Sequence, residues 1–472
     1  MFALATTVVL MAGVCRSAAS VSVGGCGMSH VSAYLPPDGE PQGFEGSSAG
    51  PRSGRRGTGG FVAKSAVIAP LTGVRLVAAV WVVLFHIYLY NGDDLSARHP
   101  AVDAVVGPIV SQGDLGVDLF FLLSGFVLAH NYLERLGEGP SLSGAVSFLW
   151  LRVARVWPLY MVAIVGGGLL LSLRFWLWGS QPNVPLTVPH FVAQVFMVQQ
   201  WGAANVPNTS WTGPAWSISA EWLAYLCFPV LAIAVWRLRR YAGPRTLVAL
   251  GGMVLLPTLV WTAVAQTQAA PYMWLVRLAS EFTCGALLSA ATRHELPRLT
   301  RASGWLAPAA IALGAAWLYV AGLTGRSWLG PLVLAVFPIL LLGLAHGDSP
   351  VHRWLGSRPM VLGGGVSFAL YLVHVPLLKL FRDALDHDAL PISPRNQLYG
   401  ELAIAALSLL IAWALFRHVE EPARHRLRAV GPRVAELPAA VRRIRLPESS
   451  RIVRVAPATE HVVQQQAVRS IC

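Results

Sequence analysis

An arginine and a histidine lie eleven residues apart in one long apolar run, LTGVRLVAAVWVVLFHIYLY. Eleven helical steps of about 100° make three turns and about 20° more, so Arg75 and His86 share one face, about 16 Å apart along the axis. Taken singly, Arg75 can be a cation that reaches the membrane surface, and His86 a hydrogen-bonded interfacial imidazole. The shared face favours function instead, with His86 as a general base because imidazole titrates near neutral pH.

A glutamate stands among tryptophans in another apolar run, NTSWTGPAWSISAEWLAYLCFP. Ser217, Glu221 and Tyr225 recur every four residues and therefore lie on one helix face. A carboxylate in apolar surroundings needs a partner, and the estimated depth of Glu221 matches that of His86. We therefore expect Glu221 to orient His86, with Ser217 as a supporting residue.

Two further runs carry polar residues for which structural and catalytic roles both stay open. In GDLGVDLFFLLSGFVLAHNYLER, Ser124 follows Asp118 and precedes Gly125, a small-residue pair that allows close helix packing. No GxSxG motif surrounds Ser124, which argues against a serine nucleophile. In VLGGGVSFALYLVHVPLLKLF, His374 follows Ser367 by seven residues, and a helix–helix hydrogen bond is favoured over a role as base. We keep Asp118, Ser124 and His374 as supporting residues.

Two arginines precede the third apolar run, in LWLRVARVWPLY. Arg152 and Arg155 stand at positions i and i+3, so on a helix they share a face at the membrane surface. Guanidinium groups form planar, multi-donor contacts with phosphates, so the two arginines suit the recognition of a phosphate group. The alternative is that both arginines only anchor the helix at the inner surface.

The composition predicts the elements that position these residues. Hydrophobic residues make up 55% of the 472 residues and charged residues only 12%, about half the share in a soluble domain. We expect an all-α polytopic membrane protein of about ten transmembrane helices, with residues 188–200 as a short re-entrant or interfacial helix. The predicted spans are residues 68–90, 116–134, 156–178, 216–236, 246–266, 272–291, 304–321, 328–345, 360–381 and 398–417.

The charge distribution predicts the orientation. The net charge of +13 comes mainly from arginines in the short loops on one side and in the tail, which is typical of positive-inside loops that meet anionic lipids, not of nucleic-acid binding. We therefore expect a multi-pass protein of the cell membrane with both termini in the cytoplasm. Residues 1–66 are predicted to be a disordered extension, 67–425 the membrane domain and 426–472 a basic cytoplasmic tail. The five cysteines are scattered, so neither a disulfide framework nor a metal site is predicted.

Six motifs occur in order along these runs. They are the Arg-x10-His of Arg75 and His86, GVDLFFLLSGF (116–126), RVARVWPLY (152–160), WSISAEW (216–222), VSFALYLVH (366–374) and EEPAR (420–424). Taken together, over about residues 68–425, they resemble the acyltransferase 3 family of integral membrane acyltransferases. The SGNH esterase-like domain that some members carry is not found in this sequence, which leaves the acceptor open.

The resemblance implies O-acyl transfer from a cytoplasmic acyl-CoA to a hydroxyl of a sugar-containing acceptor, either a cell-envelope glycan or a glycosylated metabolite. It assigns catalysis to Arg75, His86 and Glu221, and donor binding to Arg152 and Arg155. It implies no metal and no bound cofactor, since acyl-CoA is a substrate.

Two other classes of membrane protein stay open from the residues alone. A transporter or flippase can line its path with the same charges, but the sequence shows neither the repeat symmetry nor the matched Gly/Pro-broken helices of that class. In a structural or sensor protein, polar residues that share one helix face, such as Arg75 and His86, would have no function.

The charge asymmetry predicts that residues 237–245 and 292–303 lie in the cytoplasm, and residues 91–115 and 201–215 on the opposite side. Reporter fusions in each loop measure this directly. A reporter that places residues 237–245 outside would reverse the orientation and the side from which the donor enters.

Overall fold

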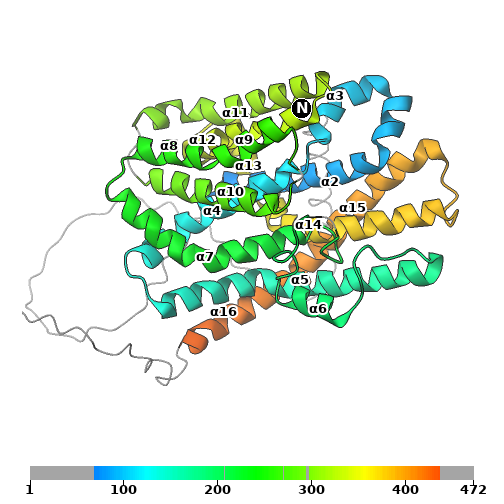
Figure 1. Ribbon diagram of the computed structural model, residues 1–472, viewed down its shortest axis with the longest axis horizontal. Helices are drawn as coiled ribbons and strands as arrows, with labels where there is room; N and C mark the ends of the chain where they lie inside the picture. Colours follow the sequence, from blue (N-terminus) through cyan, green and yellow to red (C-terminus); the bar gives the residue numbers. More distant parts are fainter. Residues whose placement is uncertain (1–67, 207, 269, 294–296, 436–472) are drawn as a thin grey trace, which may run out of the picture.

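The computed structural model describes residues 68–435 except 207, 269 and 294–296. Every regular element in these residues is a helix, and the long helices form an elongated bundle (Figure 1). Nine of the described helical segments are long and apolar enough to cross a membrane. The prediction of an all-α polytopic membrane protein is therefore confirmed. The predicted extension at 1–66 and residues 436–472 lie outside the described residues.

Single helices form most of the predicted spans. Besides α10 (Met273–Ala291), which is described below, these are α2 (Ala69–Arg98), α4 (Leu115–Gly137), α5 (Leu142–Trp178), α7 (Trp216–Arg239), α11 (Pro297–Leu323), α14 (Arg358–Asp386) and α15 (Gln397–Leu415). Short helices connect them: α3 (Pro100–Val110), α6 (Val188–Val195), α13 (Pro350–Leu355) and η2 (Pro394–Asn396). Helix α6 lies within the segment for which a short helix was predicted.

Helix α5 begins well before its predicted span, and both of its ends have a local cause. The Ser141 side chain caps the first turn by accepting from the Gly144 backbone nitrogen at 3.1 Å. Gly179 ends the helix with a left-handed backbone, at φ +69°, a conformation that glycine adopts without strain. This length places Arg152 and Arg155 on the helix itself.

Prolines interrupt two of the predicted spans. The span at 246–266 is divided into α8 (Pro244–Val254) and α9 (Leu256–Ala265) next to Pro257, which offers no backbone N–H and crowds the preceding turn. The span at 328–345 begins as the 3₁₀ helix η1 (Ser327–Val336), which contains Pro331, and continues as α12 (Phe337–His346).

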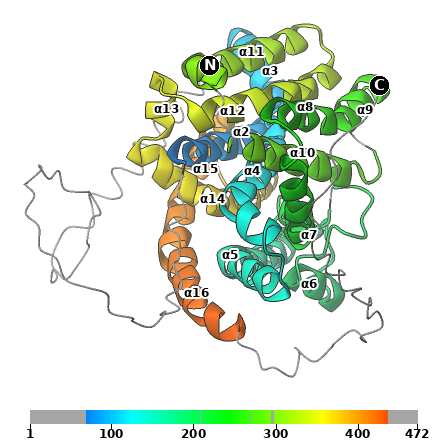
Figure 2. The same cartoon turned by 90° about the vertical axis from the view of Figure 1, so that its left-hand side faces the viewer.

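Helix α10 (Met273–Ala291) matches the predicted span at 272–291, yet it is not among the nine strongly apolar segments of the described chain. It carries Arg277 and Glu281, and most of its residues are buried against α4, α7 and α8. A Cβ atom on Gly285 would overlap the Leu122 carbonyl oxygen, so the backbones of α4 and α10 are in close contact. Figure 2 shows α4 near the middle of the bundle, beside α10.

The chain stays helical beyond the last predicted span. After α15 it passes through the π-helical turn η3 (Phe416–Glu420) into α16 (Glu421–Ala435), which packs along α5. Trp150 Nε1 donates to the Leu427 carbonyl oxygen at 2.9 Å and joins the two helices. Helix α16 therefore places the basic residues that follow the last predicted span next to the first half of α5.

Replacing Gly285 by alanine should destabilise the bundle, because the added methyl group overlaps backbone atoms of α4. We expect the free energy of unfolding to fall by about 1–3 kcal/mol, measured as a lower melting temperature of the purified protein. Gly166→Ala is the matched control, since open space surrounds its Cβ position in α5 and alanine favours helix there. Equal melting temperatures of the two variants would contradict the close packing.

Candidate active site

A cavity of about 1060 Å³ opens at the end of the bundle where α5 and α9 finish and α7 and α10 begin. Residues from the loops at 183–184 and 204–214 line it, together with residues of α2, α4, α10 and α14. Its ionisable lining side chains include His86, Arg277 and Lys379. Of the residues singled out as catalytic, His86 is the one that reaches this cavity.

His86 lies against the second histidine, His374. Nε2 of His374 is 3.3 Å from Nδ1 of His86, and the two rings meet edge to face with centroids 4.9 Å apart. Nδ1 of His86 also lies 2.9 Å from the Val82 carbonyl oxygen, and Nδ1 of His374 lies 3.0 Å from that of Leu370. His374 is fully buried behind the half-buried His86.

These contacts fix the tautomers of both neutral rings. A carbonyl oxygen only accepts, so Nδ1 carries the hydrogen in each ring. Nε2 of His374 is left as an acceptor, and it shares Nδ1–H of His86 with the Val82 carbonyl oxygen. Nε2 of His86 then holds a lone pair. No residue of the described chain bonds that nitrogen, so it is available to a molecule in the cavity.

Glu221 is not the partner of His86, and that expectation was wrong. Its Oε1 accepts a short hydrogen bond from Ser124 of α4 and a second, at 2.6 Å, from the Tyr225 hydroxyl. The sequence predicts the depth of Glu221 in the membrane, but it does not predict which neighbouring helix the Glu221 side chain contacts. Ser124 therefore donates a hydrogen bond to the Glu221 carboxylate. It stands next to Gly125, where the backbones of α4 and α10 are in close contact.

Ser217 connects the start of α7 to α14. Its hydroxyl lies 2.7 Å from that of Tyr371, which also donates to the Pro214 carbonyl oxygen at 3.1 Å. Tyr371 lines the cavity and stands one helical turn before His374. Ser217 thus helps to hold the cavity wall beside the histidine pair.

Asp118 forms a buried ion pair that the sequence analysis missed. Nε and Nη2 of Arg277 donate to its two carboxylate oxygens at 2.7 and 2.5 Å. One turn further along α10, Glu281 is 1% exposed, and the charges of Asp118 and Arg277 both act on it. Arg277 and Glu281 are ionisable residues inside a predicted span, so the rule that singled out His86 would also have found them.

Five arginines gather at the opposite end of the bundle, where α5 begins. We call them the basic cluster: Arg75, Arg152, Arg155, Arg424 and Arg428. The charges of Arg75, Arg152 and Arg424 all act on Arg155, and those of Arg152 and Arg424 act on Arg428. Two of the five come from α16 and were not predicted for the site, although Arg424 belongs to the EEPAR motif.

Few groups neutralise the basic cluster. Nη1 of Arg155 pairs with Oε1 of Glu420 at 3.1 Å. Nη2 of Arg152 donates to the Tyr132 hydroxyl at 2.9 Å, with the guanidinium 5.1 Å from the centre of that ring. Arg75 has no hydrogen-bond or ion-pair partner among the residues that the structure describes. The cluster is therefore strongly positive and suited to a polyanion.

The structure thus divides the predicted residues between two places. Arg75, Arg152 and Arg155 share the basic cluster, while His86 and His374 meet at the cavity, about 16 Å away along α2. Glu221 and Ser124 form a separate contact. Within the described residues, no three His, Cys, Asp or Glu side chains are arranged to hold a metal ion.

Comparison with known proteins gives the family. The family model described as "Acyltransferase domain", of the acyltransferase 3 family, matches residues 68–417. The protein named "Acyltransferase MdmB" of Streptomyces mycarofaciens is 27% identical over 337 residues, 66% of this chain and 78% of that protein. The protein named "Putative membrane-bound transacylase BcsY" of Komagataeibacter xylinus is 25% identical over 372 residues, 74% of this chain and 80% of that protein. No solved structure matches.

The family match covers the histidine pair and three of the five arginines of the basic cluster. Residues 68–417 include Arg75, His86, Arg152, Arg155 and His374. The match decides between the classes that the residues left open, in favour of an enzyme and against a transporter or a sensor. The chain belongs to the acyltransferase 3 family and is a membrane enzyme that transfers acyl groups.

Proposed function

We propose that the enzyme moves an acyl group from cytoplasmic acyl-CoA to a hydroxyl of a sugar-containing acceptor, a cell-envelope glycan or a glycosylated metabolite. The observation that carries the proposal is the placement of Arg75 and His86 on one face of α2. Arg75 joins the basic cluster, and His86 presents a free Nε2 at the cavity. One helix thus connects a site for phosphates to a site for proton transfer.

The basic cluster has the charge and geometry for the phosphates of coenzyme A. Those phosphates and the thioester lie at opposite ends of a long, flexible arm. With its phosphates on the cluster, an extended acyl-CoA reaches along the helix face toward His86, about 16 Å away. Planar guanidinium groups suit this task better than lysine, because each offers several donors in one plane.

Glu221 lies between the two ends. Its charge acts on Tyr225, a residue that the charges of Arg75 and Arg152 also reach. On the cavity side, its charge acts on Tyr371. We assign Glu221 as a positioning residue that fixes the hydroxyls of Ser124 and Tyr225 along the path of the acyl-bearing arm.

His86 supplies the proton transfer. Nε2 takes the proton of the acceptor hydroxyl as its oxygen attacks the thioester carbon. The C–S bond of the tetrahedral intermediate then breaks, the ester stays on the acceptor, and the proton passes from Nε2 to the leaving thiolate of coenzyme A. His374 acts through His86, because its Nε2 accepts from Nδ1–H and keeps the tautomer that exposes the lone pair.

The cavity suits a sugar-containing acceptor that enters from the end away from the basic cluster. Trp211, Trp216 and Trp274 offer flat faces for sugar rings, and Asn205 and Asn208 offer amides for hydroxyls. With both termini in the cytoplasm of a cell-membrane protein, donor and acceptor approach from opposite faces of the membrane. The chemistry requires no metal or bound cofactor, because the thioester itself is the activated group.

His86→Gln should lower turnover by at least about a hundredfold, because glutamine keeps hydrogen bonding but cannot take up a proton at neutral pH. Transfer of labelled acyl groups by purified protein measures the effect. Tyr88→Phe is the control in the same helix. The Tyr88 hydroxyl donates to Asp103 Oδ1 at 3.0 Å, and Tyr88 does not line the cavity. If His86→Gln keeps more than about a tenth of the wild-type rate, the base lies elsewhere, first at His374.

Arg152→Lys should raise the KM for acyl-CoA by about tenfold or more with a smaller change in kcat, because lysine loses the planar donor geometry. Steady-state kinetics with varied acyl-CoA measure both constants. Arg417→Lys is the control, since this arginine is exposed and pairs with Glu421 at 3.0 Å outside the basic cluster. An unchanged KM in Arg152→Lys would favour a role in anchoring the helix.

A further inference from the structure

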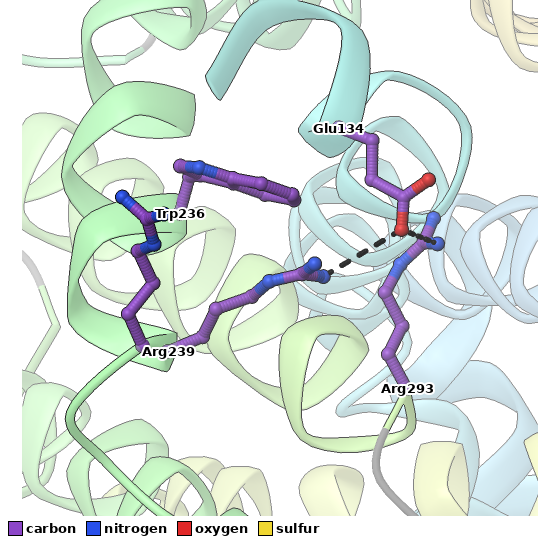
Figure 3. Close-up of a pocket in the computed structure, with 5 residues that line it drawn as sticks. Glu134, Trp236, Arg239 and Arg293 are labelled. Atoms are coloured by element: carbon purple, nitrogen blue, oxygen red, sulfur yellow. Dashed lines mark hydrogen bonds and ion pairs between the residues drawn. The ribbon is translucent and has the colours of Figure 1, made fainter. Parts of the chain in front are cut away.

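A second basic pocket lies at the same end of the bundle as the basic cluster. It has a volume of about 550 Å³ and is lined by Glu134 of α4, Trp236 and Arg239 of α7, the following Arg240, and Arg293. Figure 3 shows Arg239 and Arg293 converging on the Glu134 carboxylate beside the Trp236 ring. We call this site the inner pocket.

The inner pocket holds more positive charge than its carboxylate neutralises. Oε1 of Glu134 accepts from Arg293 at 2.7 Å and lies 3.7 Å from Nη1 of Arg239. The Arg239 guanidinium also covers the Trp236 ring, 3.8 Å from its centre. The side chain of Arg240 has no partner among the described residues, and one further carboxylate, Glu138, acts on Arg239. Three arginines therefore face two carboxylates, and one arginine is left for a ligand.

The surroundings of the inner pocket favour a lipid. Trp236 and Arg239 stand in the last turn of a membrane-spanning segment, at the level of lipid headgroups. Leu226 and Val230 of the same helix are 37% and 72% exposed, so α7 presents an apolar face to its surroundings. Leu226 and Arg240 are fourteen residues apart, which places them within about 40° around the helix. Acyl chains along this face would lead directly to the pocket.

The inner pocket is separate from the basic cluster. Tyr132, the partner of Arg152, and Glu134 stand two positions apart on α4. Two helical steps turn the side chain by about 200°, so the two residues point to opposite sides of α4. A ligand in the inner pocket therefore does not occupy the site proposed for the acyl donor.

We propose that the inner pocket binds the phosphate headgroup of an anionic phospholipid. Basic pockets between membrane helices on the cytoplasmic side suit such headgroups, since arginine pairs with phosphate oxygens and tryptophan lies at the interface. Soluble phosphate esters share the headgroup chemistry but have no acyl chains to lie on α7. An experiment can therefore distinguish a phospholipid, which has acyl chains, from a soluble phosphate ester, which has none.

Native mass spectrometry of the purified full-length protein tests the proposal, with phosphatidylglycerol or phosphatidylcholine added in detergent. Arg240→Gln should weaken phosphatidylglycerol binding by about fivefold, and Arg240→Gln with Arg293→Gln by roughly tenfold to thirtyfold. Arg237→Gln with Arg245→Gln is the matched control, because it removes the same charge from exposed positions that do not line the pocket. The Arg240 side chain is exposed, and Arg240→Gln breaks no hydrogen bond or ion pair within the described residues, so we expect the fold to be unchanged.

The proposal expects a selective loss in the pocket variants, with the KM for acyl-CoA unchanged. An equal loss in the control pair would show diffuse attraction to a basic surface and overturn the site. A raised KM for acyl-CoA with unchanged lipid binding would assign the inner pocket to the donor instead. Displacement of phosphatidylglycerol by glycerol phosphate at equal concentration would assign it to soluble phosphate esters and overturn the lipid assignment.

Discussion

The helical repeat of α2 is the constraint on which the site depends. It holds Arg75 and His86 on one face at a fixed separation, so the arginine that we propose for donor binding and the histidine that we propose as the base cannot shift relative to each other. The neighbouring helix α14 completes the arrangement, because His374 accepts from His86 and leaves Nε2 of His86 as the free nitrogen. Rigid spacing along one helix thus fixes the distance between the two sites, and a hydrogen bond between two helices orients His86 at the cavity.

Buried polar contacts hold the remaining helices around that face. The paired Asp118 and Arg277 join α4 to α10, and the loss of one partner from such a buried pair typically costs about 3–5 kcal/mol. Ser217 and Tyr371 join α7 to α14 at the cavity, and Trp150 joins α5 to α16 at the basic cluster. The contacts that stabilise the bundle are therefore also the walls of the two sites.

Spacing along single helices was predictable, and contacts between helices were not. The shared face of Arg75 and His86 and the pairing of Arg152 with Arg155 follow from the 3.6-residue repeat. The partner of Glu221 does not follow from this repeat, because hydropathy gives the depth of a residue in the membrane but not the direction in which its helix face points relative to neighbouring helices. The contribution of Arg424 and Arg428 depends on the path of α16 back along α5, which no local pattern of the tail encodes. Arg277 was detectable from sequence but was overlooked among apolar neighbours.

Transfer across a sealed bilayer tests whether donor and acceptor bind at opposite ends of α2. Proteoliposomes of one orientation would receive labelled acyl-CoA on the basic-cluster side and an impermeant sugar glycoside on the cavity side. We expect labelled glycoside in that arrangement, and none when acyl-CoA is present only on the cavity side. Label that forms only when both reagents share one compartment would contradict a donor site and an acceptor site at opposite ends of α2.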